Sequence, residues 1–180
     1  MKKGRSLIAL ISLLPWGFLP VQALWNLNPA PVVSPNQLFS LQRSKDANTI
    51  IYEANVNAGQ HLDPSKPVAV YWIRYAERGQ RENLTQVQWQ MAYGYRHKPS
   101  SESGAYDICL NAFPQRPLRI AYHNGKPVAL LLINGERACL QSVFVQVDSK
   151  AHLIPRVKFI ELHGTDVLTN KSVHERISLN

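Results

Sequence analysis

The chain has 180 residues, 20 Lys and Arg against 12 Asp and Glu, and a formal net charge of +8. This length fits one domain plus a short N-terminal segment. The positive charge is spread along the chain and accompanies no nucleic-acid-binding motif, so we expect no nucleic-acid partner. With only two cysteines, outside any Cys-x-x-Cys pair, the sequence nominates no metal site and no cofactor.

The N-terminus is typical of a secretory signal. A basic head over residues 1–5 precedes an apolar run over residues 6–14, and Pro15 and Pro20 then interrupt any helix. That run is too short to cross a bilayer, which takes about 20 apolar residues. We predict a signal peptide over residues 1–23 with cleavage after Ala23, the alternative being an uncleaved N-terminal anchor. Cleavage removes three basic residues and lowers the charge from +8 to +5.

Removal of the signal leaves a protein that we expect to be secreted, in the periplasm. No later segment is apolar and long enough to span a membrane. Residues 24–48 are rich in Pro and Asn and are typical of an extended leader outside the core. We therefore place a single β-rich domain over residues 49–177 and a short tail over residues 178–180.

The first part of this domain predicts two strands and a helix. Apolar and polar residues alternate over residues 49–57, and a second strand over residues 68–75 is apolar on both faces. Residues 83–96 follow a helical pattern, with Asn83 as the N-cap. Its expected core stripe consists of Leu84, Val87, Met91 and Tyr95.

The second part predicts a run of antiparallel strands. A strand over residues 106–113 and a turn over residues 114–117 lead to strands over residues 118–123, 128–133 and 137–147. Two Asn-Gly pairs, Asn124-Gly125 and Asn134-Gly135, separate the last three as two-residue hairpin turns. A last strand over residues 157–163 precedes a polar tail. The fold class is α+β and mainly β: a strongly bent antiparallel sheet, small barrel or sandwich of about seven strands with one packed helix.

Cys109 and Cys139 form a possible disulfide, since an even count in an oxidising compartment permits one. Two buried free thiols are the alternative. Two strands would separate the cysteines in a flat sheet, at about 4.8 Å per strand. A bond therefore requires the sheet to close or fold over.

Two groups of residues are candidate sites. Glu161 and His163 are two apart on one strand, so they share a face, and a carboxylate beside an imidazole suits acid–base chemistry or metal binding. No third partner is signalled, and a solvated polar edge is the alternative. Arg74 lies among aromatic residues and suits stacking and anion binding. The alternative is that Arg74 pairs with a structural carboxylate such as Glu53, and the surrounding candidates are Tyr71, Trp72 and Tyr75.

Several blocks resemble a largely bacterial, secreted family of unknown function. The segments Ile51-Tyr52-Glu53-Ala54-Asn55-Val56-Asn57 and Val70-Tyr71-Trp72-Ile73-Arg74-Tyr75 are similar to the opening of the DUF4833 family. Ala92-Tyr93-Gly94-Tyr95 and Ile160-Glu161-Leu162-His163-Gly164 are similar to later blocks. The resemblance extends over residues 49–177. It implies one domain, and it brings no activity and no catalytic residues.

Three functions remain open from the sequence. A binding domain for an apolar or anionic small molecule, centred on Arg74, is favoured over an enzyme. The first alternative is a hydrolytic enzyme that uses Glu161 and His163. The second is a cell-envelope interaction module that adds a partner's strand to an exposed edge of the meander. The partner is accordingly an unknown small molecule or an envelope protein.

Overall fold

The computed structural model describes residues 34–43, 47–148 and 156–179. The predicted signal peptide and about half of the expected leader, residues 24–33 and 44–46, lie outside these residues. The described part belongs to the unit formed by residues 33–180. Its strands are β1 Gln37–Arg43, β2 Thr49–Ala54, β3 Val68–Arg74, β4 Gln80–Asn83, β5 Tyr95–Pro99, β6 Tyr106–Leu110, β7 Phe113–His123, β8 Lys126–Ile133, β9 Glu136–Asp148, β10 Arg156–Asp166 and β11 Ser172–Ser178.

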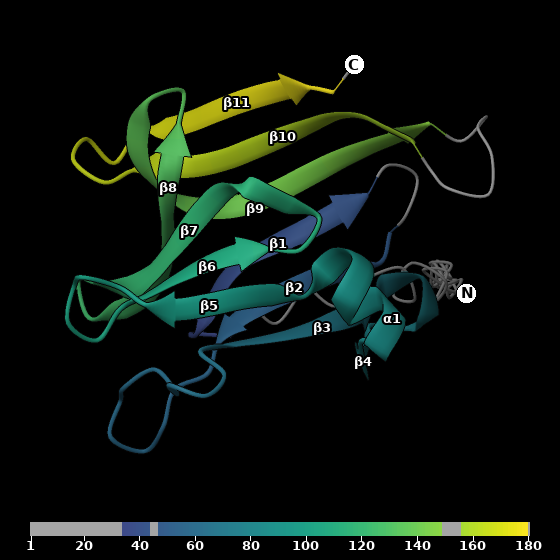
Figure 1. Cartoon of the computed structure of the whole chain (residues 1–180). Coiled ribbons are helices and arrows are strands. Elements are labelled where there is room, and N and C mark those ends of the chain that lie inside the picture. Colours follow the sequence, from purple (N-terminus) through teal and green to yellow (C-terminus); the bar gives the residue numbers. More distant parts are fainter. Residues whose placement is uncertain (1–33, 44–46, 149–155, 180) are drawn as a thin grey trace, which may run out of the picture. The chain divides into compact units, whose positions relative to one another are not determined.

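All eleven strands belong to one strongly curled sheet, which confirms the mainly β class (Figure 1). The strand order is β4-β3-β2-β1-β9-β8-β7-β6-β5, and β10 and β11 continue from the other side of β9. The long strand β9 is the branch point, since β8 pairs with its first part and β1 with its later part. Neighbouring strands are antiparallel except β1 and β9, which run parallel.

Both Asn-Gly hairpins are present as predicted. Asn124 and Gly125 have φ angles of 51° and 74°, and Asn134 and Gly135 have φ angles of 50° and 85°. Positive φ at both central residues is the requirement of the type I′ turn. The turns join β7 to β8 and β8 to β9, so the meander forms where the sequence places it.

The predicted helix over residues 83–96 is wrong in extent and in its buried face. Asn83 ends β4, and a single helical turn, α1 (Gln86–Gln88), begins instead at the N-cap Thr85. A capping box between Thr85 and Gln88 starts the turn, which continues as a π-helical turn over Trp89–Tyr93. Val87 and Met91 are exposed, whereas Tyr93 and Tyr95 are buried. Spacing alone did not distinguish the two sides of so short a helix.

Three further boundaries differ from the sequence-based ones. Residues 37–43 of the expected leader form β1, which lies inside the sheet and buries Leu38 and Phe39. The expected turn over residues 114–117 is part of β7. The expected polar tail contains β11, which pairs with β10. In the case of β1, pairing with the distant strand β9 overrides a polar local composition, whereas β11 forms a hairpin with the preceding strand β10.

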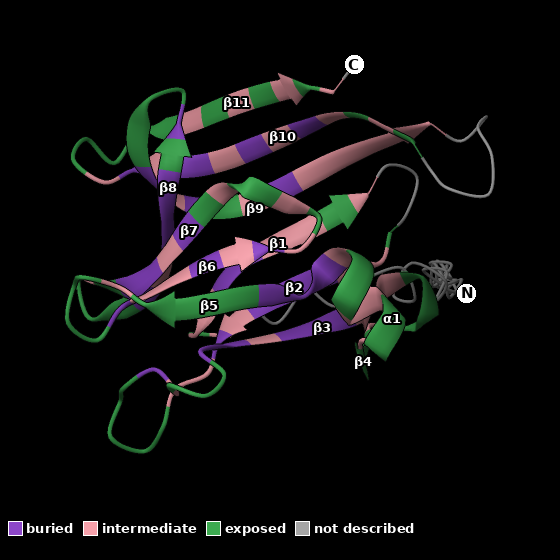
Figure 2. Cartoon of the chain, in the orientation of Figure 1, coloured by how far each residue is buried: buried purple, intermediate pink, exposed green. Residues whose placement is uncertain are grey.

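The core lies on the inner face of the curl. Buried residues alternate with partly exposed ones along β10, as the purple and pink bands in Figure 2 show. Ile160, Leu162 and Gly164 face inward, and Glu161 and His163 face outward. A Cβ atom on Gly164 would lie 2.6 Å from the Cys139 carbonyl oxygen, so only glycine permits this approach of β10 to β9. No helix among the described residues has the length and apolar character that a membrane span needs.

Candidate functional site

Arg74, the centre of the predicted binding site, is held by an acidic side chain at the end of the β3–β4 hairpin. Its Nε lies 2.7 Å from Glu82 Oε2, and its Nη2 donates to Oε1 at 3.2 Å. The guanidinium also stacks over Trp72, with Cζ 4.7 Å from the ring centroid. These hydrogen bonds lower the pKa of Glu82. The acidic partner of Arg74 is therefore Glu82, and not Glu53, which the sequence offered as an example of such a partner.

Glu53 belongs to a separate cluster with Tyr71. Its carboxylate accepts hydrogen bonds from Ser34 Oγ and, at 3.0 Å, from the Tyr71 hydroxyl. The Arg81 guanidinium lies over the Tyr71 ring, 3.6 Å from its centroid. Burial, followed by the hydrogen bond to Glu53, raises the pKa of Tyr71 to about 12. Glu53 and Tyr71 therefore form a structural network and do not join Arg74 in one site.

Trp72 and Tyr75 have different surroundings. Trp72 is buried and packs edge-on against Tyr93, with ring centroids 5.4 Å apart. Its indole N–H is buried and has no hydrogen-bond partner among the described residues. Tyr75 opens a 3₁₀ turn, Tyr75–Glu77, and burial raises its pKa. Arg74 and its predicted neighbours therefore form the end of a hairpin and part of the core wall.

An apolar cavity of about 340 Å³ lies elsewhere, on the inner face of the sheet. Its walls come from β1, β9, β10, the π-helical turn and the β6–β7 connection. Most of the lining is aliphatic or aromatic, as in Leu41, Tyr52, Met91, Ala92, Tyr93, Leu110, Ala112, Phe113, Leu118, Leu131, Leu140, Val143, Val145, Val147, Val157, Ile160, Leu162 and Leu179. Arg43 and Arg116 are the charged residues in the lining. Met91 of the predicted helix lines it, but none of the candidate site residues named from the sequence does: Glu53, Tyr71, Trp72, Arg74, Tyr75, Glu161 and His163.

Two polar side chains of the cavity wall, Tyr52 and Arg43, contact other parts of the protein. The Tyr52 hydroxyl donates to the Tyr93 carbonyl oxygen at 2.8 Å, and burial raises the pKa of Tyr52. The Arg43 guanidinium packs against two aromatic rings, 6.0 Å from the Tyr93 centroid and 5.8 Å from that of Trp72. The wall therefore offers an apolar surface with cationic side chains at its margin.

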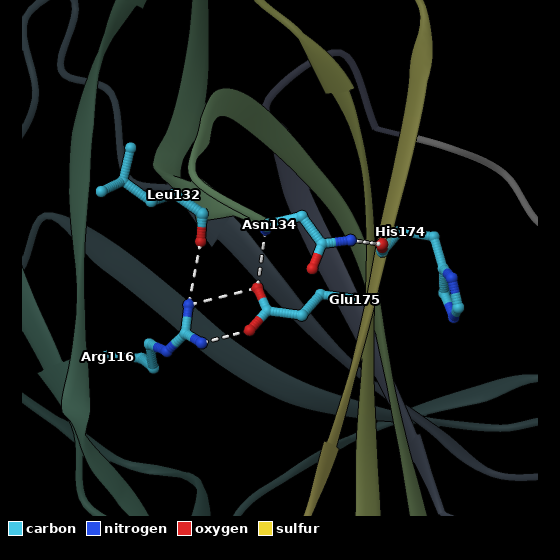
Figure 3. Close-up of polar contacts among 5 residues, drawn as sticks. All are labelled: Arg116, Leu132, Asn134, His174 and Glu175. Carbon is cyan, nitrogen blue, oxygen red and sulfur yellow. Dashed lines mark hydrogen bonds and ion pairs between the residues drawn. The ribbon is translucent and has the colours of Figure 1, made fainter.

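Arg116 is fixed by a polar cluster that joins β7, the β8–β9 turn and β11 (Figure 3). Its guanidinium donates to both carboxylate oxygens of Glu175 and, at 3.1 Å, to the Leu132 carbonyl oxygen. The Asn134 backbone N–H donates to Glu175 Oε2 at 2.9 Å, and the Asn134 side chain donates to the His174 carbonyl oxygen. Partial burial raises the pKa of Glu175, but the Arg116 and Asn134 hydrogen bonds lower it by more, and its net shift is downward. We call these residues the Glu175 clamp.

A second, wider cavity of about 960 Å³ lies over β5 to β8. Its cationic lining residues are Arg96, Lys98, Arg116, Arg119 and Arg137, with Asp107 among them. Arg119 Nε pairs with Asp107 Oδ1 at 3.0 Å, and Arg116 belongs to the Glu175 clamp. Part of the positive charge is therefore balanced within the wall.

Glu161 and His163 meet a third residue that the sequence did not nominate. His174 on β11 is the direct cross-strand partner of His163, and the two rings lie 4.8 Å apart between centroids. The His163 and His174 Nε2 atoms each lie 3.9 Å from an oxygen of Glu161. Arg176 donates to Glu161 Oε1 at 2.8 Å, and this bond lowers the pKa of Glu161. We call Glu161, His163 and His174 the outer-face cluster.

The outer-face cluster was missed because β11 was interpreted as a tail. The one signal was the weak alternation of Val173 and Ile177 with polar residues, which indicates a strand with one inward face. Pairing of that strand with β10 brings His174 opposite His163. The cluster lines neither of the two cavities. The hydrolytic alternative thus gains a third group but not the cleft that it needs.

Cys109 and Cys139 are free thiols in the structure. Cys109 lies on β6 and Cys139 on β9, with β7 and β8 between them in the sheet. The curl does not fold these strands over one another. Burial raises the pKa of the Cys139 thiol, so it is a poor nucleophile.

The envelope-module alternative required a free edge on the meander. Each meander strand pairs on both sides: β7 with β6 and β8, β8 with β7 and β9, and β9 with β8 and β10. The ends of the main strand order are β4 and β5. Both carry charged side chains, which oppose strand addition.

The fold and cavity define a class: a mainly β domain whose curled sheet encloses an apolar cavity on its inner face. The chain belongs to the DUF4833 family, a domain of unknown function, whose family model matches residues 39–176. The match begins within β1, so this strand belongs to the domain. No curated protein and no solved structure matches the chain.

Proposed function

We propose that this protein binds a small molecule with an apolar body in the inner-face cavity. The cavity itself carries the proposal, because an apolar volume of about 340 Å³ lies in the range of ligand sites, roughly 300–1,000 Å³. Aliphatic residues of β9 and β10 form much of the wall, among them Val143, Ile160 and Leu162. Arg74 no longer supports the proposal, since it pairs with Glu82 outside the cavity.

The lining favours an aliphatic ligand with a polar or anionic end. At about 30 Å³ for each water-sized group, the cavity has room for roughly ten such groups, as in a medium-length alkyl chain. Burial of apolar surface at about 25 cal/mol/Å² supplies the driving force. Arg43 and Arg116 lie at the margin, where a carboxylate or similar anion gains a favourable field.

Native mass spectrometry tests the proposal first, on protein prepared through the secretory route. A small molecule that leaves the protein on gentle unfolding supports the proposal and identifies the ligand class. Titration with decanoate, followed by displacement of a neutral naphthylamine dye, then measures affinity. No retained molecule, together with no binding of decanoate or dye up to millimolar concentration, would refute the proposal.

A cavity-filling variant places the binding in the cavity. Ala112 lines the cavity and is exposed, so Ala112→Trp adds bulk beside the cavity at a position that tolerates a larger side chain. We expect at least a tenfold loss of decanoate affinity. Ala58→Trp in an exposed turn is the matched control and should bind as the parent does. Equal affinities of the two variants would place the ligand elsewhere.

We also propose that the protein acts outside the cytoplasm, in the periplasm. The support is the basic head, short apolar run and small residues at Ala23. Fractionation of cells that express the full chain, with N-terminal sequencing of the product, tests this. A mature N-terminus at Leu24 in the periplasmic fraction is the expected result, and intact protein in the cytoplasm would contradict it.

A further inference from the structure

The outer-face cluster is arranged as a set of metal ligands. His163 and His174 are directly opposite on antiparallel strands, where Cβ atoms are about 5 Å apart. Glu161 lies two residues before His163 and so points to the same face. One ligand atom from each of the three residues falls within 4.8 Å of the others. The side chains are partly exposed, with 44% and 53% of the two histidine side chains accessible.

We propose that Glu161, His163 and His174 bind a divalent transition-metal ion, with Zn²⁺ as the defining case. Two imidazole nitrogens and one carboxylate oxygen form a common zinc ligand set, and the fourth position is left to water. Imidazole also suits Cu²⁺ and Ni²⁺, while Mg²⁺ and Ca²⁺ prefer oxygen ligands alone. Ligand atoms about 2.1 Å from zinc lie roughly 3.4 Å from each other. Small rotations of these exposed side chains therefore complete the site.

Arg176 positions the carboxylate of this site. It donates two hydrogen bonds to Glu161 Oε1, at 2.8 and 2.5 Å, and its guanidinium packs on Phe159 with Cζ 4.3 Å from the ring centroid. These bonds orient Glu161 and leave Oε2 for the metal. A hydrogen-bonded ligand of this kind is typical of metal sites, where the outer partner fixes the inner one.

The Glu175 clamp holds the strand that carries His174. Figure 3 shows the His174 ring on the opposite side of β11 from the Glu175 carboxylate. The Asn134 side chain fixes the His174 backbone, and Arg116 fixes Glu175. The metal ligands thus project from two paired strands, one of which is clamped from behind. Sites on rigid elements lose less entropy on binding.

The proposed metal site is independent of the proposed ligand site. Ile160 and Leu162 of β10 line the cavity, while Glu161 and His163 point to the other face. The Ala112→Trp variant should therefore lose decanoate affinity and keep its zinc affinity. Failure of either proposal leaves the other standing, and the two experiments distinguish them.

Isothermal titration of the purified, chelator-treated protein with ZnCl₂ tests the metal site. We expect one Zn²⁺ per chain, with at least a tenfold loss of affinity in His163→Ala, in His174→Ala and in Glu161→Gln. His123→Ala is the matched control. His123 is also a partly exposed histidine, but it lies at the β7–β8 turn, away from the outer-face cluster, and contacts Asn124. The control should bind zinc as the parent does.

Two results would overturn the metal site. One is the absence of saturable Zn²⁺ binding, and the other is an equal effect of His174→Ala and His123→Ala. Thermal melts of the metal-free variants check that they fold. Because the substituted residues are partly exposed, we expect the melting temperature of each variant to equal that of the parent. A cobalt-substituted sample adds a spectroscopic test, with intense visible bands expected for a four-coordinate site and lost in His174→Ala.

Discussion

The two Asn-Gly turns have the same dipeptide and nearly the same backbone, yet they have different places in the molecule. At the β7–β8 turn, the Asn124 side chain contacts its neighbour His123. At the β8–β9 turn, Asn134 donates from its backbone to Glu175 and from its side chain to the His174 carbonyl oxygen. One turn only reverses the chain, whereas the other also fixes β11 on the sheet.

The difference shows that local chemistry determines the backbone conformation of a turn, while tertiary contacts determine how much the turn contributes to stability. Both dipeptides adopt positive φ for the same reason, the tolerance of Asn and Gly for that region. The second turn lies beside a strand from forty residues later in the chain, and the Glu175 clamp forms there. Substitutions at matched positions of the two turns can separate the local from the tertiary contribution.

Removal of the Glu175 carboxylate should give the largest loss of stability. Glu175→Ala removes the bonds to Arg116 and to the Asn134 N–H, and it leaves a half-buried cation without this partner. We expect a loss of about 2–3 kcal/mol in the free energy of unfolding, measured by urea titration. Glu82→Ala breaks the Arg74 pair, whose carboxylate is exposed, and should lower the free energy of unfolding by much less than Glu175→Ala does. Equal losses in both variants would contradict the importance given to the clamp.

Truncation of the two turn asparagines should separate the local from the tertiary contribution. Asn124→Ala places alanine at positive φ and should cost about 1 kcal/mol. Asn134→Ala has the same backbone cost and also loses the bond to the His174 carbonyl, for a total of about 2 kcal/mol. Urea unfolding of both variants measures the difference. A difference near zero would mean that the side-chain bond contributes nothing.

Acid should weaken the second turn more than the first. The folded pKa of Glu175 lies below its ordinary value of 4.5, so its stabilisation is fully present above pH 4.5 and is lost as the pH falls through the lower folded value. We expect Glu175→Gln to reduce the slope of stability against pH below 4.5. Chemical unfolding at a series of pH values checks this, with Asn124→Ala as a control that keeps the parent slope.

The smallest expected effect is on the affinity for zinc. Asn134→Ala frees the β11 backbone at His174, and we expect a threefold to fivefold loss of Zn²⁺ affinity. Asn124→Ala, on a hairpin without contact to β11, should bind as the parent does. Zinc titration of both variants under one set of conditions provides the comparison. If Asn124→Ala also lost Zn²⁺ affinity, the loss in Asn134→Ala could not be attributed to the Glu175 clamp.

The sequence predicts those elements whose signals are local. Alternation at residues 49–54, the apolar β8 strand and both Asn-Gly turns indicate most of the meander and its neighbours. Strands β1 and β11 were not predicted, because the local composition of these segments is polar or proline-rich. The strand β1 pairs with β9, about a hundred residues later in the chain, which no local pattern expresses. The strand β11 forms a hairpin with β10, but its many polar residues weaken the strand signal.

The candidate sites follow the same division. Glu161 and His163 share a face because they lie two apart on one strand, and this the sequence predicts. Their meeting with His174 depends on the register of β10 with β11 and was not predictable from either segment alone. The pairing of Arg74 with Glu82 was not predictable for a related reason, since it crosses a hairpin whose second strand ends at Asn83, the residue interpreted as a helix N-cap.

The position of β1 has a consequence for the time course of folding. Ser40 of β1 pairs with Ser142 of β9. The strand β1 is therefore synthesised about a hundred residues before the strand with which it pairs. Phe39 can stack on Tyr52 of β2 early, but until β9 emerges from the ribosome β1 lacks the strand that pairs with its other side. Sheets with such distant contacts fold in about milliseconds to seconds. A nascent chain truncated before β9 should therefore remain sensitive to protease, and the full-length chain should gain resistance only after its release.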